Sequence, residues 1–509
     1  MAPPSFEFVV QEGNLAPSKI TQTKIRRQAM KAVAAARRHT GRYGKHNLRQ
    51  HTVSYTKTDS DLSPAAVPVE DRDKRVVVHK KRSDHGRGDD DHYPNQEIAC
   101  RATDETVAMA PTKLSTSWFF SGLELFMMDY SIQPADLSAL TSIHLGLVAS
   151  ALFAVQPAKL KELLSCRQWS YFEHMYSRYG HSACLDDAIR CLIMGAQYLL
   201  APSSRTSSGM ILAQYGTALK SLQKAINDPN GWADPDTLCA THILQLFSVL
   251  YPAACNAQTW SQHLSGCMRM MQLKGPHDFK TDYEKALLTT FAASITTETL
   301  LQNQVCFLEE PGWQEAVAAC KLETDLFSDR SPFAIEIANL IHRLPGACKR
   351  VGDVVCGDNP SAEDIERVRQ EVRQLRKEIR LFRNRFDTQL IVELPLSTVS
   401  VSDKYKRLDT LANALMCEIL SARLMGSVSV SERFLMEDEI QQHGSYISKM
   451  EETSNGNDYR TAFYMSQKGV IVLSLMDTSP LWRAPCRSDD IIEAWKFRRW
   501  CDALPRRSP

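Results

Sequence analysis

Residues 260–276 read Trp-Ser-Gln-His-Leu-Ser-Gly-Cys-Met-Arg-Met-Met-Gln-Leu-Lys-Gly-Pro, and this stretch says more about the fold than any other. Its large residues recur at steps of three and four, as on one face of a helix: Trp260, His263, Leu264, Met268 and Met271. Gly275 suits a left-handed position at the end of a helix, and Pro276 cannot continue one. The stretch therefore predicts a helix with a defined end just before Gly275.

The same period recurs from about residue 113 to residue 505, where the alternation typical of strands is scarce. It predicts helices over Trp118–Tyr130, Ser138–Val155, Leu185–Leu200, Gly209–Ile226, Pro235–Tyr251, Ala286–Leu301, Ile335–Arg343 and Ser361–Phe386. Breaks rich in proline, glycine and aspartate separate these segments. Helices joined by short loops predict one all-α domain over residues 113–505.

The clearest single helix is expected over Ser361–Phe386. Ser361 and Asp364 have nearly the spacing of a capping box, with aspartate where glutamate or glutamine is usual. Six apolar residues then form one stripe: Ile365, Val368, Val372, Leu375, Ile379 and Phe382. The stripe favours an amphipathic helix on the domain surface, and the alternative is a dimerising coiled coil.

Residues 1–50 are strongly basic, because ten lysines and arginines stand against two glutamates, a net charge of +8. This excess predicts an N-terminal arm that contacts nucleic acid or another acidic surface. Residues 24–38 fit a basic amphipathic helix as well as they fit a solvated tail. The candidate nucleic-acid contacts are Lys24, Arg26, Arg27, Lys31, Arg37, Arg38, Arg42 and Lys45.

Residues 51–112 are polar and poor in bulky apolar side chains, which predicts a disordered linker between the arm and the helical domain. Within this linker, a basic cluster fits a nuclear import signal: Lys74, Arg75, Lys80, Lys81 and Arg82. Basic clusters also occur by chance in linkers. The import signal is therefore a hypothesis, and it requires that the protein act in the nucleus.

Motifs that carry catalysis are missing from the sequence, since it holds no glycine-rich phosphate loop, G-x-S-x-G elbow or H-E-x-x-H pair. His181 and Cys184 lie three apart with Cys191 beyond them, but no second ligand pair follows, so core packing is favoured over zinc binding. The single histidines are interpreted as hydrogen-bonded structural residues: His144, His174, His242 and His263. We expect no catalytic residue, no metal and no cofactor.

A membrane segment is not expected. The most apolar run, about Leu145–Val155, is far shorter than the roughly 20 residues that a spanning helix needs. The first residues contain prolines and glutamates and form no apolar signal segment. We therefore expect a soluble intracellular protein whose cysteines are reduced core thiols.

The pattern W-x2-H-x2-G, an apolar run and then Gly-Pro resembles the middle homology region of fungal-specific transcription factors. Tyr215–Asp228 and Cys306–Trp313 resemble flanking segments of that family, and Phe6–Arg38 is similar to an N-terminal region of members without a zinc cluster. The resemblance implies a large helical regulatory domain with structural motif positions: Trp260, His263, Gly266, Gly275 and Pro276. The indole of Trp260 is expected to anchor helix packing, and Gly266 to permit close helix approach.

The DNA-binding module of that family is missing here. A binuclear zinc cluster needs six thiolates, arranged in two C-x2-C-x6-C sets that hold two metal ions. The 14 cysteines of this chain form no C-x2-C pair, and the first of them is Cys100. Any contact with DNA must therefore be made by another part of the chain or by a partner.

Three functional interpretations follow. The resemblance implies a transcriptional regulator in a fungal nucleus, frequently of a secondary-metabolite gene cluster, that reaches DNA through the basic arm, a partner transcription factor or a homodimer. The second interpretation is a scaffold or co-regulator that binds another transcription factor without touching DNA. The third is an enzyme with an unrecognised all-α active site, which a polar cleft with several perturbed titratable groups would favour.

Overall fold

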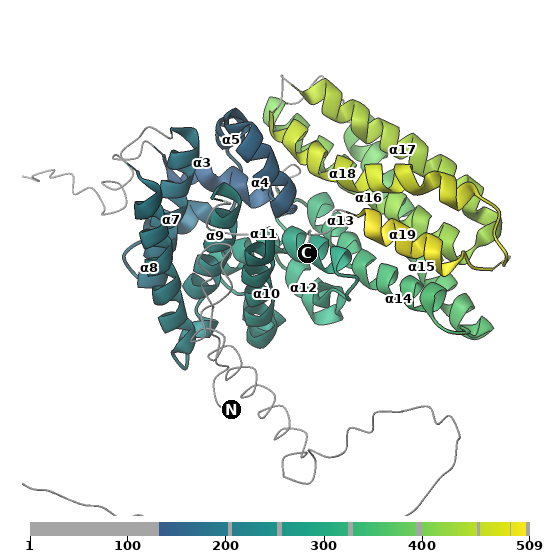
Figure 1. Cartoon of the computed structure of the whole chain (residues 1–509), viewed down its shortest axis with the longest axis horizontal. Helices are drawn as coiled ribbons and strands as arrows, with labels where there is room; N and C mark the ends of the chain where they lie inside the picture. Colours follow the sequence, from purple (N-terminus) through teal and green to yellow (C-terminus); the bar gives the residue numbers. More distant parts are fainter. Residues whose placement is uncertain are drawn as a thin grey trace, which may run out of the picture. The chain divides into compact units, whose positions relative to one another are not determined.

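The computed structural model of this chain describes residues 132–504, apart from 202–205, 252–256, 324–328, 393–399, 456–458 and 489. Helices are the regular elements of this described part, and no strand occurs in it, so the predicted all-α class is confirmed (Figure 1). The predicted arm, the linker and the expected helix Trp118–Tyr130 lie outside the described residues.

In the described part, buried apolar residues form two clusters, and the first involves mainly the helices before residue 320. These helices are α3 (Pro134–Leu137), α4 (Gly146–Val155), α5 (Pro157–Leu164), α6 (Met175–Arg178), α7 (Ala183–Leu200), α8 (Ser208–Asn227), α9 (Pro235–Leu250), α10 (Ala257–Lys274), α11 (Asp282–Leu301) and α12 (Pro311–Ala318). α9 is central, because every residue from Asp236 to Leu250 is buried. It packs against α4, α7 and α10, so its buried residues lie on all sides and include polar ones such as His242 and Gln245.

The second cluster involves mainly the later helices. They are α13 (Pro332–His342), α14 (Leu344–Cys356), α15 (Ala362–Phe386), α16 (Val401–Val428), α17 (Arg433–Ser454), α18 (Tyr459–Arg483) and α19 (Ala494–Ala503). α16 lies among α14, α15, α17 and α18. The two clusters, called core 1 and core 2 below, meet where α11 contacts α13 and α14 and where α18 contacts α5.

The expectation that no segment is long and apolar enough to span a membrane is corrected by α16. Its residues Asp403–Val428 are long and apolar enough to cross a membrane by length and composition, unlike the shorter run Leu145–Val155 that the sequence analysis singled out. The most apolar window of α16 is 94% buried inside the protein, as in the central helix of a folded domain. The helix therefore does not by itself bear on membrane association.

Most expected helices are present as α7, α8, α9, α11, α13 and α15, but the expected helix Ser138–Val155 is wrong. A 3-10 helix covers Ser138–Ser142, and α4 begins only at Gly146. Gln467 of α18 causes the break, because its side-chain oxygen accepts the N–H groups of residues 144 and 145 at 3.0 and 3.1 Å. Its amide nitrogen donates to the Ser142 carbonyl at 3.1 Å, so a side chain replaces the helical hydrogen bonds.

α15 keeps its apolar stripe inside the protein. The Ser361 hydroxyl accepts the Asp364 N–H at 3.0 Å, and it donates to the Asp364 carboxylate at 2.7 Å. The stripe is buried at Val368, Val372, Leu375, Ile379 and Phe382 and partly buried at Ile365. It packs against α13, α14 and α16, so the amphipathic-helix interpretation is confirmed and a coiled coil through this stripe is excluded.

Candidate functional site

The candidate contacts in the N-terminal regions cannot be placed. The eight basic residues between Lys24 and Lys45 and the import cluster Lys74–Arg82 lie outside the described residues. They stay predictions from the sequence. The family motif, in contrast, lies on α10 and at its C-terminal end, within the described part.

Trp260 and His263 are buried at the contact between α10 and its neighbours. The Trp260 indole lies against Gly146 of α4, so that a Cβ added to the glycine would be 2.8 Å from Cε2 of the ring. The His263 ring nitrogen Nε2 lies 3.3 Å from the Tyr215 hydroxyl of α8. Burial lowers the pKa of His263 to about 4, so its ring is neutral at pH 7. Both side chains hold α10 in place.

The end of the motif is a helix stop. α10 ends at Lys274, and the N–H of Gly275 still donates to the Met271 carbonyl at 2.9 Å. Gly275 has φ +83° and ψ 159°, so the expected positive φ is present, although this ψ lies outside the left-handed helical region. The conformation is one that essentially only glycine adopts. Pro276 begins a 3-10 turn, and Gly266 is half-buried, so its role in close helix approach stays a prediction.

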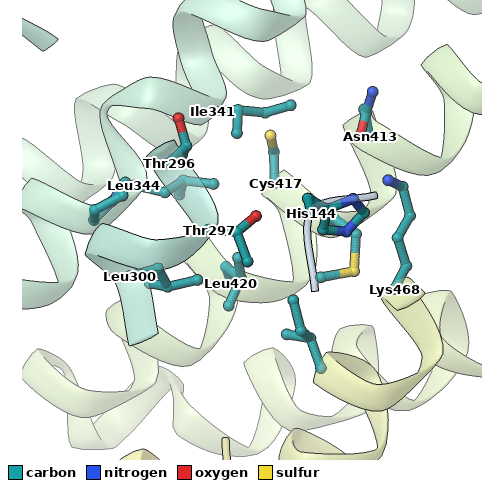
Figure 2. Close-up of a pocket in the computed structure, with 13 residues that line it drawn as sticks. His144, Thr296, Thr297, Leu300, Ile341, Leu344, Asn413, Cys417, Leu420 and Lys468 are labelled. Atoms are coloured by element: carbon teal, nitrogen blue, oxygen red, sulfur yellow. The ribbon is translucent and has the colours of Figure 1, made fainter. Parts of the chain in front are cut away.

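A cavity of about 70 Å³ lies where core 1 and core 2 meet. One wall is apolar and comes from several helices: Leu300, Ile341, Leu344, Met416, Leu420 and Ile471. The opposite end is polar, and Figure 2 shows Lys468, His144 and Asn413 grouped there, with Leu300 and Leu344 across the cavity. Thr296 and Thr297 of α11 also line the cavity, so its lining mixes apolar and polar side chains.

Lys468 is the most unusual group of this cavity. Its side chain is 5% exposed, and its Nζ lies 3.4 Å from the centroid of the Tyr464 ring. Among the residues that the structure describes, Nζ has neither a hydrogen bond nor an ion pair. Burial lowers the pKa of Lys468 to about 7, and attraction from the Asp409 carboxylate opposes that effect. Burial thus disfavours the charged form of the amine.

His144 and Asn413 complete the polar end. His144 Nδ1 lies 3.3 Å from the Ser142 carbonyl, and burial together with the Lys468 charge lowers the pKa of the ring to about 3. Asn413 uses its side-chain oxygen to accept the Tyr464 hydroxyl at 2.9 Å. Figure 2 shows the Asn413 nitrogen on the side away from Lys468. The site presents a neutral ring, an amide and an amine.

A second cavity of about 180 Å³ also reaches Asn413 and is more polar. It contains the ion pair between Arg460 and Asp409, whose closest atoms, Nη2 and Oδ2, are 3.3 Å apart. Asp409 is therefore already neutralised by a cation on α18. The only cation of the smaller cavity, within the described residues, is Lys468.

Lys468 and Asn413 were not among the residues predicted from the sequence, and His144 was predicted only as a structural residue. A signal for Lys468 was present, because it occupies the buried face of α18 between Met465 and Val472 at helical spacing. A lysine on such a face is rare unless it is paired. Asn413 carries no comparable signal in the sequence.

Metal binding finds no support in the part of the chain that the structure describes, where no group of three histidine, cysteine or acidic residues could hold an ion. Cys184 and Cys191 are buried in core 1, as expected, while His181 is exposed. The hydrogen-bonded role expected for the histidines is also seen at His242, whose Nδ1 lies 2.8 Å from the Tyr171 hydroxyl. It is not seen at His174, whose ring packs against Tyr283 and has no hydrogen bond to another described residue.

Comparison with known proteins identifies no family. No family profile and no solved structure matches this chain. An uncharacterized protein of Emericella nidulans is 26% identical to it over 159 residues, which are 30% of this chain and 33% of that protein. The chain is thus similar to about a third of the length of this fungal relative.

Proposed function

We propose that the protein is a transcriptional regulator in a fungal nucleus, and that it controls one pathway such as a secondary-metabolite gene cluster. The observation that carries the proposal is the Trp260–Pro276 segment. Its motif resembles that of fungal-specific transcription factors, and its tryptophan and terminal glycine have structural roles in an all-α domain. The fungal source of the similar protein supports the proposed setting.

In this proposal the basic arm makes the DNA contact. Lysines and arginines that neutralise phosphates release counterions, so binding weakens steeply with salt. The test is a gel-shift series with the full chain across salt concentrations, using a variant in which Lys24, Arg26, Arg27, Lys31, Arg37 and Arg38 become glutamine. Loss of six phosphate contacts should lower the log–log salt slope by about 5. Equal binding by the variant and the wild type would contradict the arm's role.

The basic cluster in the linker supplies the matched control. Changing Lys74, Arg75, Lys80, Lys81 and Arg82 to glutamine should leave DNA binding nearly intact. The same variant, fused to a fluorescent protein, should accumulate outside the nucleus if the cluster is the import signal. Unchanged nuclear fluorescence would remove the cluster from the proposal.

A co-regulator that binds another transcription factor is the second candidate, because the chain has no C-x2-C pair for a zinc cluster. Affinity purification of the full chain from nuclear extract should then recover a DNA-binding regulator. Transcript profiling of a deletion strain tests both candidates together, since each predicts the silencing of a co-localised gene set. An unchanged transcriptome would oppose both and would favour the enzyme alternative.

A further inference from the structure

The cavity at the junction of core 1 and core 2 contains a buried cation without a counter-charge in contact. Lys468 Nζ has only the Tyr464 ring beside it among the described residues, and ring attraction offsets part of the cost of removing an ammonium from water. Asp409 is the acidic group whose charge acts on the pKa of Lys468, and its carboxylate is in an ion pair with Arg460. An anion in the cavity would therefore complete the pairing of Lys468.

Lys468 is the hydrogen-bond donor that an anion in the cavity would meet. The side-chain oxygen of Asn413 accepts the Tyr464 hydroxyl, and Figure 2 shows the Asn413 nitrogen on the side away from Lys468. The three N–H groups of a protonated amine suit the oxygens of a carboxylate.

The far side of the cavity limits the size of the ligand. Figure 2 shows Leu300 of α11 and Leu344 of α14 there, with Thr296 beside them. A volume of about 70 Å³ corresponds to the space of roughly two water molecules, so a carboxylate with a single methyl group fits and longer chains do not.

We propose that this cavity is a binding site for a small carboxylate of the size of acetate, with the carboxylate against the Lys468 ammonium and the methyl group toward Leu300 and Leu344. The ligand would contact α11, α14 and α18 and thereby stabilise the folded protein. The site does not depend on the proposed role in transcription, because it rests only on the cavity.

Binding should depend on pH in a defined direction. The carboxylate pairs with the protonated amine, and the pKa of Lys468 in the free protein is about 7, so affinity should fall about tenfold per pH unit above that value. The other titratable groups that influence or face this amine are Asp409 and Cys417 of α16, Tyr464 of α18, and His144. Burial raises the pKa of Cys417 and of Tyr464, and His144 stays neutral above pH 5, so none of these three gains charge between pH 7 and 8.

The test is calorimetric titration of the full chain with sodium acetate and, as the neutral analogue of equal shape, acetamide. Acetate should bind at least about tenfold more tightly than acetamide at pH 7, and its binding at pH 8 should take up protons. Equal affinity for the two compounds, or the absence of saturable binding across the series from formate to butyrate, would overturn the proposal. Neither result bears on DNA binding, so the proposed function would be unaffected.

Two variants locate the site. Lys468→Met removes the charge, keeps a flexible unbranched side chain one atom shorter and should abolish the preference for acetate, and Lys220→Met on the exposed face of α8 is its matched control. Leu300→Phe should block the cavity without touching the amine. Thermal melting of each variant tests whether the fold is retained. Wild-type acetate affinity in Lys468→Met would place binding elsewhere and contradict the proposal.

Discussion

The indole of Trp260 occupies the space that a side chain at Gly146 would need. A Cβ at this glycine would lie 2.8 Å from Cε2 of the ring, closer than real Cβ contacts. The motif tryptophan of α10 and the first residue of α4 therefore depend on each other. This relationship explains why α4 begins with glycine, a poor helix former.

Gly146→Ala should lower the free energy of unfolding by about 1–3 kcal/mol, because the added methyl group must displace a buried ring. Gly216→Ala is the matched control, since no atom lies within 4 Å of a Cβ there, and it should stabilise α8 by about 0.5–1 kcal/mol. Urea unfolding of both variants measures the difference. In the double variant Gly146→Ala/Trp260→Phe, the loss of unfolding free energy should be smaller than the sum of the losses in the two single variants. A double-variant loss equal to that sum would contradict the contact between the two residues.

Gly275→Ala tests a different kind of constraint. No atom lies within 4 Å of a Cβ at Gly275, so the substitution creates no clash. Its φ of +83° with ψ of 159° is costly for alanine, and the expected loss is about 1–3 kcal/mol of unfolding free energy. Because the cost comes from the backbone, Trp260→Phe should not reduce it. A Gly275→Ala protein as stable as the wild type in urea would show that the helix ends differently.

The buried ion pair between Arg423 and Glu437 should be costly to break. Both side chains are 0% exposed, the Nε–Oε1 distance is 3.0 Å, and the guanidinium lies 4.1 Å from the Trp482 ring centroid. Glu437→Gln should cost about 3–5 kcal/mol, because it leaves a buried cation without its counter-charge. The double variant Arg423→Met/Glu437→Leu should be less destabilised than Glu437→Gln alone.

A neighbouring surface pair between α17 and α18 is the control for that prediction. Asp438 pairs with Arg483, and their side chains are 68% and 38% exposed. Asp438→Asn should therefore cost less than about 1 kcal/mol in the same urea experiment. Similar losses in Asp438→Asn and Glu437→Gln would mean that burial does not determine the cost.

Acid should destabilise the protein through its buried histidines. Burial lowers the pKa values of His144, His242 and His342 to about 3 and of His263 to about 4, against 6.5 for an exposed histidine. Below pH 6.5 the unfolded chain binds protons that the folded chain does not, so stability is full above 6.5 and falls as the pH approaches 3. At pH 5 each such histidine costs about 2 kcal/mol.

His342→Leu should consequently reduce the loss of unfolding free energy between pH 7 and pH 5 by about 2 kcal/mol. The exposed His277, changed to glutamine, is the control and should keep the wild-type difference, because its side chain is in water in both states. Denaturation curves at the two pH values provide the measurement. An unchanged difference in His342→Leu would show that this histidine is protonated in the folded protein.

Local sequence was sufficient for much of the fold. Helices such as α9 and α15 follow from apolar spacing, from Ser361 as N-cap and from proline and glycine breaks, since these effects act within a few residues. The expected helix Ser138–Val155 was wrong for the opposite reason. Its break is caused by Gln467, which is 323 residues from His144 in the sequence.

The sequence by itself determined that this chain is built of helices, that α10 ends before Gly275, and that no C-x2-C pair is present for a zinc cluster. Tertiary structure alone decided that Trp260 packs on Gly146, that a glutamine interrupts a helix, and that Lys468 lies in a cavity beside Asn413. The physical reason is the distance along the sequence over which each effect acts. Helix periodicity and caps are short-range properties of neighbouring residues, whereas the surroundings of a buried amine depend on distant segments that meet only when the two cores pack.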